Sequence, residues 1–136
     1  MSLTVNVIFH LVDDNDIDIA VNTKLLQLSG ITPDIHTYNN AAKFLQSIQS
    51  NQEYYSTKEH VILLDIMMPG MNGFECLDEL SKLPEKIKAR MKVFMLSSSI
   101  DRNDIRRAES YDLVQRVLEK PLDIYLLKKT LEGIYE

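Results

Sequence analysis

The sequence predicts an α/β protein built on five parallel strands, each followed by a helix. Apolar runs of strand length alternate along the chain with segments whose apolar residues recur at helical spacing. Strands that are separated by helices pair in parallel, through right-handed crossovers. Because the strand runs are almost continuously apolar, we expect helices on both faces of the sheet.

The first half of the chain contains segments of both kinds. The run TVNVIFHLV is rich in β-branched residues, as strands are, and the apolar residues after it recur at helical spacing as far as Gly30, a typical helix end. Residues 50–59 are polar and are predicted to form a loop. The predicted elements are strands over residues 4–12, 34–38 and 60–64 and helices over residues 17–28 and 41–49.

The second half follows the same alternation. Asn72 and Glu75 stand three residues apart, as in a capping box that begins a helix. Asp123 is predicted to cap the last helix, and residues 83–90 are predicted to form a surface loop. The predicted elements are helices over residues 72–80, 101–111 and 123–134 and strands over residues 91–96 and 113–118.

Length and composition favour one domain that has protein or small-molecule partners. We assign all 136 residues to a single domain, residues 1–136, with residues 1–3 as a candidate remnant of an expression vector. The 15 basic and 20 acidic side chains give a net charge of −5, which disfavours non-specific binding to nucleic acid or to membranes. Cys76 is the single cysteine and no signal peptide or membrane-spanning run is visible, so we expect a cytoplasmic protein without disulfides.

Charged and hydroxyl side chains follow the predicted strands at their carboxyl ends. They are Asp13, Asp14, Asp65, Ser97 and Lys120. In an open parallel sheet these strand ends meet at one edge, where ligands bind. Three close carboxylates repel one another unless a cation joins them, and Mg²⁺ prefers such oxygen ligands.

These side chains are sufficient for phosphoryl transfer. An aspartate can attack phosphorus and form an aspartyl phosphate, and Asp65 is the candidate for this role. The reaction needs positioned positive charge, which Lys120 and Mg²⁺ would supply. Ser97 could donate a hydrogen bond to a phosphoryl oxygen. We expect no organic cofactor.

Four motifs give a resemblance to a known family. They are VDDN (residues 12–15), LLDIMMPGMNGFE (63–75), MLSSS (95–99) and EKP (119–121). In this order and at this spacing, they resemble the markers of the response-regulator receiver domain of two-component signalling, over nearly the whole chain. The resemblance implies a flavodoxin-like (βα)5 fold, a doubly wound parallel sheet with strand order 2-1-3-4-5.

The resemblance also implies partners, a metal and residue roles. Asp65 would accept a phosphoryl group from the phosphohistidine of a sensor histidine kinase or a histidine phosphotransfer protein. Mg²⁺ would be bound by Asp13, Asp14, Asp65 and the backbone carbonyl of Met67. In addition, Ser97 and Lys120 would contact the phosphoryl group, and the Lys120–Pro121 peptide bond would be cis.

The implied output is a switch in protein–protein contacts, made without nucleic acid or membrane. The downstream protein is unknown, and the face formed by residues 101–111, 113–118 and 123–134 is a candidate surface for it or for a dimer. The chain would be a stand-alone receiver or part of a longer protein. It would not be an enzyme for a separate substrate, since the family catalyses only its own phosphorylation and slow autodephosphorylation.

Two positions depart from the family pattern. Val117 stands where the family often has an aromatic residue that rotates inward during switching. The change is therefore expected to travel instead through the loop after Ser97 and the face formed by residues 101–111, 113–118 and 123–134. Leu113 stands where a small residue is common.

Two rival functions stay open: a small phosphatase or phosphotransferase, and a receiver that binds partners without phosphorylation. The first usually needs a second acid where this chain has Met67.

Each candidate residue also has a purely structural interpretation. Asp13 and Asp14 could begin a helix, and Asp65 could simply terminate a strand. Lys120 could be a solvated charge, and Ser97 could be an ordinary strand end. His10 is predicted to be a hydrogen-bonded core residue. Other groups are expected to be structural rather than functional: Met67, Met68 and Met71 as core and loop packing, Cys76 as a buried thiol, and Arg102, Arg106 and Arg107 as a solvated helix face.

Overall fold

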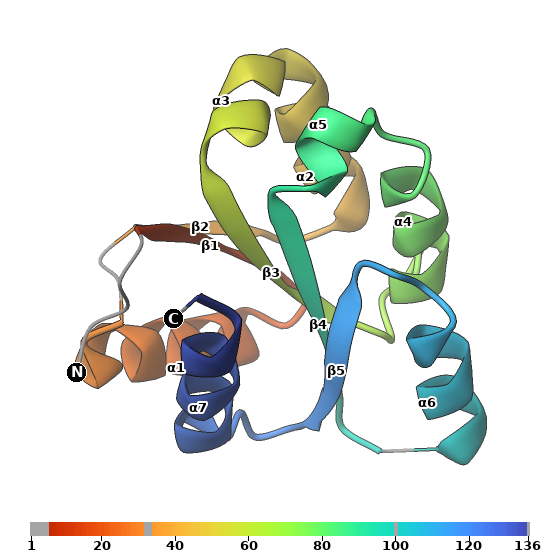
Figure 1. Ribbon diagram of the computed structural model, residues 1–136. Coiled ribbons are helices and arrows are strands. Elements are labelled where there is room, and N and C mark those ends of the chain that lie inside the picture. Colours follow the sequence, from red (N-terminus) through yellow and green to blue (C-terminus); the bar gives the residue numbers. More distant parts are fainter. Residues whose placement is uncertain (1–5, 32–33, 100, 136) are drawn as a thin grey trace.

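The computed structural model describes residues 6–31, 34–99 and 101–135 of the chain and shows one five-stranded parallel sheet (Figure 1). The strand order is β2-β1-β3-β4-β5, as predicted. The first strand was predicted to start at residue 4, which lies outside the described residues. The candidate remnant at residues 1–3 lies outside them as well. The strands are β1 (Val7–Val12), β2 (Ile35–Tyr38), β3 (Glu59–Asp65), β4 (Met91–Ser97) and β5 (Val114–Glu119).

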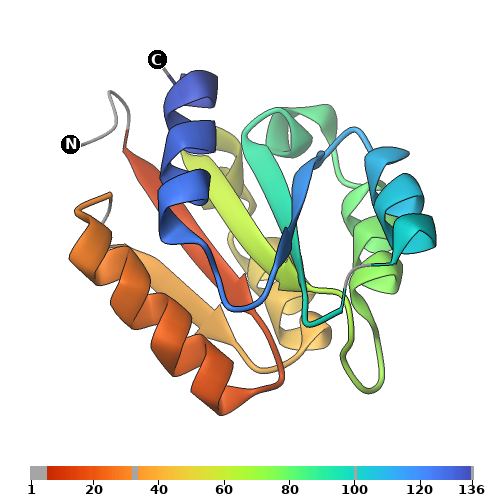
Figure 2. The ribbon, with the colours of Figure 1, turned by 90° about the horizontal axis from the view of Figure 1, so that it is seen from below.

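Helices cover both faces of the sheet, which confirms the predicted layers. Figures 1 and 2 show two helices on one face, α1 (Asp16–Ser29) and α7 (Ile124–Tyr135). The other face is covered by α2 (Ala41–Ser50), α3 (Gln52–Thr57), α4 (Gly73–Leu80), α5 (Glu85–Lys88) and α6 (Arg102–Glu109). Within the described part of the chain, no helix combines the length and the apolar character that crossing a bilayer requires.

The core has two halves, one on each face of the sheet. Alternate residues of a strand point to opposite faces, and β3 shows this directly. Val61 and Leu63 pack with the buried residues of α1 and α7, whereas Ile62 and Leu64 pack with those of the other helices. Burial on both sides explains why the strand runs are almost continuously apolar.

Two predicted loops contain short helices. Residues 52–57 form α3, and residues 85–88 form α5. Each places one fully buried side chain in the core, Tyr55 with 1% of its surface exposed and Ile87 with 0%. Because one buried residue in a polar segment makes no helical pattern, periodicity could not predict either helix.

The predicted helix-end signals are confirmed, namely Gly30, the capping box of Asn72 and Glu75, and Asp123. The side chain of Asn15 accepts hydrogen bonds from the first turn of α1, and Gly30 ends that helix with a φ of 75°. Asn72 and Glu75 form the predicted capping box of α4. Asp123 accepts a hydrogen bond from the backbone N–H of Leu126 at 3.0 Å, as expected of a cap on α7.

Candidate functional site

The three predicted carboxylates meet at the carboxyl edge of the sheet. β1 and β3 are neighbours and Val12 pairs with Leu64 in register, so the residues that follow each strand end side by side. Carboxylate oxygens of Asp13, Asp14 and Asp65 all lie within 4.8 Å of one another. Asp13 and Asp65 are buried, and Asp14 is exposed. The site therefore has a solvent-facing side through which an ion or a phosphoryl donor can enter.

Lys120 brings positive charge to these acids from the end of β5. Its Nζ atom lies 2.9 Å from Oδ2 of Asp13 and 3.5 Å from Oδ1 of Asp65. The Lys120–Pro121 bond is cis, as predicted. The backbone N–H of Lys120 also donates to the carbonyl of Ser97 at 2.8 Å, which ties the end of β5 to the end of β4.

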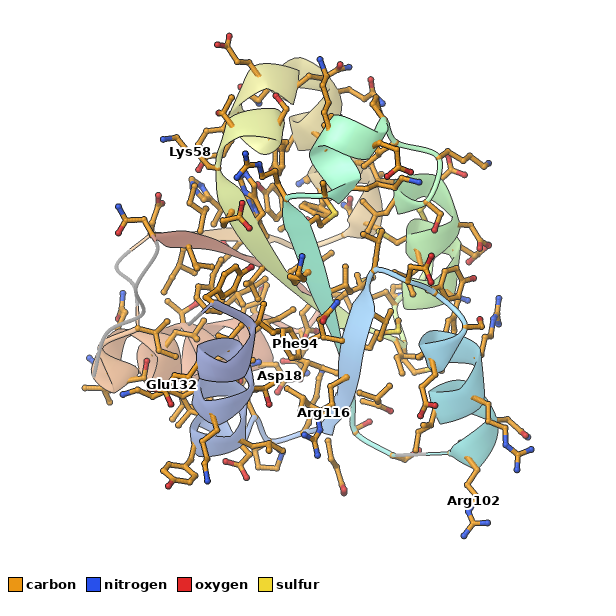
Figure 3. All side chains as sticks on the ribbon, in the orientation of Figure 1. Asp18, Lys58, Phe94, Arg102, Arg116 and Glu132 are labelled. Carbon is orange, nitrogen blue, oxygen red and sulfur yellow. The ribbon has the colours of Figure 1, made fainter. Side chains whose placement is uncertain are left out.

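A fourth acid, Asp18, also contacts Lys120 and is not among the residues that the strand ends predict. Its Oδ2 lies 2.9 Å from Nζ of Lys120, and Figure 3 labels its position. Asp18 belongs to the first turn of α1, a position where an acid is favoured by the helix dipole whatever it contacts. The sequence therefore shows an acid at a helix start, but its partner, Lys120, lies 102 residues away.

Ser97 and Met67 border the acids in different ways. Ser97 is buried, and its hydroxyl donates to the carbonyl of Ser99 at 2.6 Å. The backbone N–H of Met67 donates to Oδ1 of Asp65 at 3.4 Å. The Met67 side chain is 70% exposed, which corrects the expectation that all three methionines of this segment serve in packing. Its neighbour Met68 is buried as expected.

The electrostatics of the site suit a divalent cation. Burial, and next the negative charge of Asp13, raise the pKa of Asp65 to about 6 although Lys120 opposes the shift. Burial by itself lowers the pKa of Lys120, but hydrogen bonds to Asp13 and Asp18 raise it above the ordinary lysine value. An excess of carboxylates over ammonium groups, with oxygen ligands and one exposed acid, matches the ligand preference of Mg²⁺.

Comparison with known proteins decides the family. The family model described as "Response regulator receiver domain" matches residues 9–132. This chain belongs to the response regulator receiver domain family. It is 33% identical to the nitrate/nitrite response regulator protein NarL of Escherichia coli over 118 residues, which are 87% of this chain and 46% of NarL. The chain thus spans about half of that relative.

This chain spans most of the length of other similar proteins. Response regulator Rcp1 of Synechocystis sp. is 29% identical over 126 residues, which are 91% of this chain and 83% of Rcp1. The crystal structure of a response regulator receiver protein from Dyadobacter fermentans has a TM-score of 0.78 and 36% identity, and covers 93% of this chain and 96% of its own. A two-component response regulator from Cytophaga hutchinsonii has a TM-score of 0.84 and 27% identity, and covers 96% of each chain.

Val117 lies in β5, and the three arginines predicted as a solvated helix face lie on the neighbouring helix α6. Val117 pairs with Met95 in register and is half-buried against the core under α4 and α6. Arg102 and Arg106 are exposed on α6, as predicted, and Arg102 points away from the body of the molecule in Figure 3. Arg107 lies with its guanidinium carbon 4.3 Å from the centre of the Phe74 ring.

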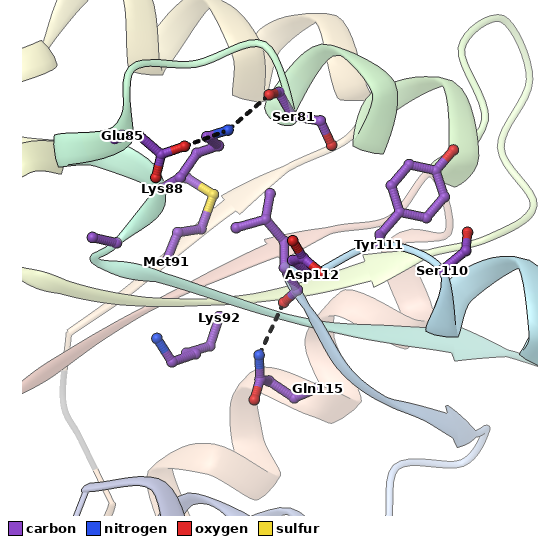
Figure 4. A pocket seen from close by; sticks show the side chains of 11 residues that line it. Ser81, Glu85, Lys88, Met91, Lys92, Ser110, Tyr111, Asp112 and Gln115 are labelled. Carbon is purple, nitrogen blue, oxygen red and sulfur yellow. Dashed lines mark hydrogen bonds and ion pairs between the residues drawn. The ribbon is translucent and has the colours of Figure 1, made fainter.

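A separate cavity of about 350 Å³ lies at the opposite end of β4 and β5 (Figure 4). It is lined by Ser81, Lys88, Tyr111 and Gln115, among others, and Lys88 donates to the carbonyl of Ser81 at 3.0 Å. Met91, at the start of β4, also lines it, whereas the acids follow the strands' carboxyl ends. This cavity is therefore not part of the acidic site.

Proposed function

We propose that this receiver domain accepts a phosphoryl group on Asp65 from the phosphohistidine of a sensor histidine kinase or a histidine phosphotransfer protein, and that the modification switches its protein contacts. One observation carries the proposal: a buried carboxylate, Asp65, is flanked by two more acids and by the ammonium group of Lys120. Membership of the response regulator receiver domain family supports it.

Asp65 would act as the nucleophile. One carboxylate oxygen attacks phosphorus, a P–O bond forms, and the bond between phosphorus and the donor's imidazole nitrogen breaks with its electron pair moving to that nitrogen. Lys120, whose Nζ atom lies 3.5 Å from Oδ1 of Asp65, would neutralise charge on the phosphoryl oxygens. Because this transfer depends mainly on position and on electrostatic stabilisation, the rigid end of β3 is a suitable place for the nucleophile.

Mg²⁺ would be held by Asp13, Asp14, Asp65 and the backbone carbonyl of Met67. When bound, the ion supplies positive charge beside the transferred phosphoryl group. Its presence favours the ionised form of Asp65, which is the nucleophilic form, against the burial that raises the pKa of this side chain.

Phosphorylation would switch the surface that includes α6, β5 and α7. The new group carries a charge of about −1.5 to −2 and three acceptor oxygens. To reach it, the Ser97 hydroxyl must leave the carbonyl of Ser99, and this rearranges the loop that leads to α6. Reversing a population from about 1:99 to 99:1 needs about 5.5 kcal/mol, which a few charge-assisted hydrogen bonds can supply. The resulting surface would bind a downstream protein or a second copy of the domain.

The deciding experiment is incubation with acetyl phosphate and Mg²⁺, followed by mass spectrometry of the intact protein. We expect one phosphoryl group on the wild type and none on Asp65→Asn. Asp112→Asn, which removes an exposed acid near the cavity of Figure 4, is the matched control and should still be modified. An adduct that survives Asp65→Asn would remove the proposal.

We also propose that the domain does not turn over a separate substrate. A phosphatase of this chemistry needs a second acid to protonate the leaving group, and the position two residues after Asp65 is Met67, whose side chain is exposed. Sustained phosphate release from p-nitrophenyl phosphate, far beyond one equivalent per protein, would favour the enzyme instead.

A further inference from the structure

Lys120 is shared between acids from three different elements. Its Nζ atom lies at the same distance, 2.9 Å, from Asp13 at the end of β1 and from Asp18 on α1. Asp65, at the end of β3, is farther away at 3.5 Å. The Lys120 side chain is only 14% exposed, so water does little to replace a lost partner.

The carboxylate of Asp13 cannot bind the ammonium group of Lys120 and a divalent cation equally well at the same time. Its Oδ1 accepts the backbone N–H of Asn15 at 2.9 Å, and its Oδ2 accepts the ammonium group of Lys120. A divalent ion at the three acids would use the same carboxylate, and two positive charges on one oxygen repel each other. Metal binding therefore favours movement of Lys120 away from Asp13.

We infer that Asp18 is a positioning residue, which holds the ammonium group of Lys120 inside the site when a divalent cation takes Asp13. The inference rests on the proposed function, because it assumes Mg²⁺ at the three acids. Asp18 is well placed for the task. Its backbone N–H donates to the capping side chain of Asn15 at 3.1 Å, so the first turn of α1 is held in place. Its carboxylate is 34% exposed and is close to Lys120 but outside the cluster of three acids.

A purely local explanation for Asp18 can be separated by experiment. An acid in the first turn of a helix is favoured by the helix dipole whatever it contacts. Asp16 occupies the same turn and is exposed, so it offers the same charge and the same dipole effect. Asp16→Asn is therefore the matched control for Asp18→Asn.

The first test is a double-mutant cycle read out by Mg²⁺ titration in the absence of any phosphoryl donor. In the wild-type background, we expect Asp18→Asn to weaken Mg²⁺ binding by about two- to fivefold more than Asp16→Asn, the range expected of one partly exposed ion pair. In the Lys120→Ala background the two substitutions should have equal effects, because there is no ammonium group left to hold. An unchanged difference in that background would overturn the inference.

The second test does not need the Lys120→Ala protein. The Lys120 ammonium group is followed by nitrogen NMR with Mg²⁺ bound. We expect a hydrogen-bonded signal in the wild type, its loss in Asp18→Asn and its recovery in Asp18→Glu, which restores the carboxylate. A signal that persists in Asp18→Asn would contradict the role of Asp18. If wild-type protein bound no Mg²⁺ at all, the metal part of the proposed function would fail first, and this inference with it.

Discussion

Gly73 lies directly against the backbone of Asp65. A Cβ atom at position 73 would be 2.5 Å from the carbonyl oxygen of Asp65 and 3.0 Å from Cα of Ile66. The backbone N–H of Gly73 donates to the carbonyl of Ile66 at 2.9 Å. The start of α4 thus packs on the end of β3 with no room for a side chain, and this contact holds the backbone of Asp65 in place.

We expect Gly73→Ala to destabilise the domain and to disturb Asp65. Backbone atoms must shift to admit the methyl group, which costs about 1–3 kcal/mol in a packed site. Urea unfolding should show the loss in the free energy of unfolding, and acetyl phosphate should modify the variant more slowly than the wild type.

Gly133→Ala is the matched control for this substitution. Gly133 lies in α7 and a Cβ there would meet nothing within 4 Å. Alanine is the better helix former, so this variant should be more stable than the wild type by about 0.5–1 kcal/mol. A Gly73→Ala protein as stable as the Gly133→Ala protein would show that the contact with Asp65 is not tight.

Asp65→Asn should stabilise the metal-free domain near neutral pH. The pKa of Asp65 is raised from 3.8 to about 6, so the folded state holds this proton more tightly than the unfolded chain does. As the pH rises through 6 the folded protein must ionise a disfavoured group and loses stability. At pH 7.5 without Mg²⁺ the asparagine variant should therefore be more stable, by at most about 3 kcal/mol.

The difference in stability between the wild type and Asp65→Asn should vanish near pH 4, where the carboxyl group of Asp65 is protonated in the folded state. Mg²⁺ at pH 7.5 should also reduce this difference in stability, because the ion stabilises the wild type and not the asparagine variant. Thermal unfolding of both proteins at the two pH values is the measurement. A wild type that is the more stable of the two at pH 7.5 without Mg²⁺ would contradict the raised pKa.

Acid should destabilise the domain through a buried histidine pair, His10 and His60. Nε2 of His60 lies 3.1 Å from the carbonyl of Tyr54 and must donate to it, so Nδ1 of His60 accepts the Nε2–H of His10 at 2.9 Å. Nδ1 of His10 then accepts the hydroxyl of Tyr38 at 3.3 Å. Burial is the largest cause that lowers the pKa of both rings, so the folded protein favours their neutral forms.

Below the ordinary histidine pKa of 6.5, these two side chains take up protons more readily in the unfolded chain than in the folded protein, because burial lowers their pKa. As the pH is lowered, the free energy of unfolding should then decrease by up to about 1.4 kcal/mol per pH unit for each histidine. His10→Gln keeps an N–H for His60 but removes one of these groups, so its free energy of unfolding should fall less steeply between pH 6.5 and 5. Tyr38→Phe, the control, should lower stability by the same amount at both pH values. Equal slopes for wild type and His10→Gln would reject this account.

Lys120→Ala should destabilise the metal-free domain because it leaves Asp13, Asp18 and Asp65 without their ammonium partner. We expect a loss of about 1–3 kcal/mol at pH 7.5, since breaking a mostly buried pair leaves uncompensated charge. Mg²⁺ should restore much of the loss, because the ion replaces the missing positive charge. Chemical unfolding with and without Mg²⁺ measures both effects. If Mg²⁺ stabilised the variant no more than it stabilises the wild type, Lys120 would not be the counterion of this cluster.

The order of the five strands and the position of the candidate site were determined by the sequence alone. Parallel strands all end at one edge of the sheet, so Asp13, Asp65 and Lys120 had to converge there once the strands were recognised. The cis bond before Pro121 and the family followed from motifs in the sequence. These features depend on the period and order of residues, which a sequence displays directly.

Other features were decided only by the tertiary structure. The helix over residues 52–57 depends on the burial of one residue, Tyr55, and the contact of Asp18 with Lys120 joins segments 102 residues apart. The close approach of Gly73 to Asp65 likewise exists only after α4 has packed on β3. A sequence shows which residues share an element, but a contact between elements depends on how their surfaces fit, and only the folded chain sets that fit.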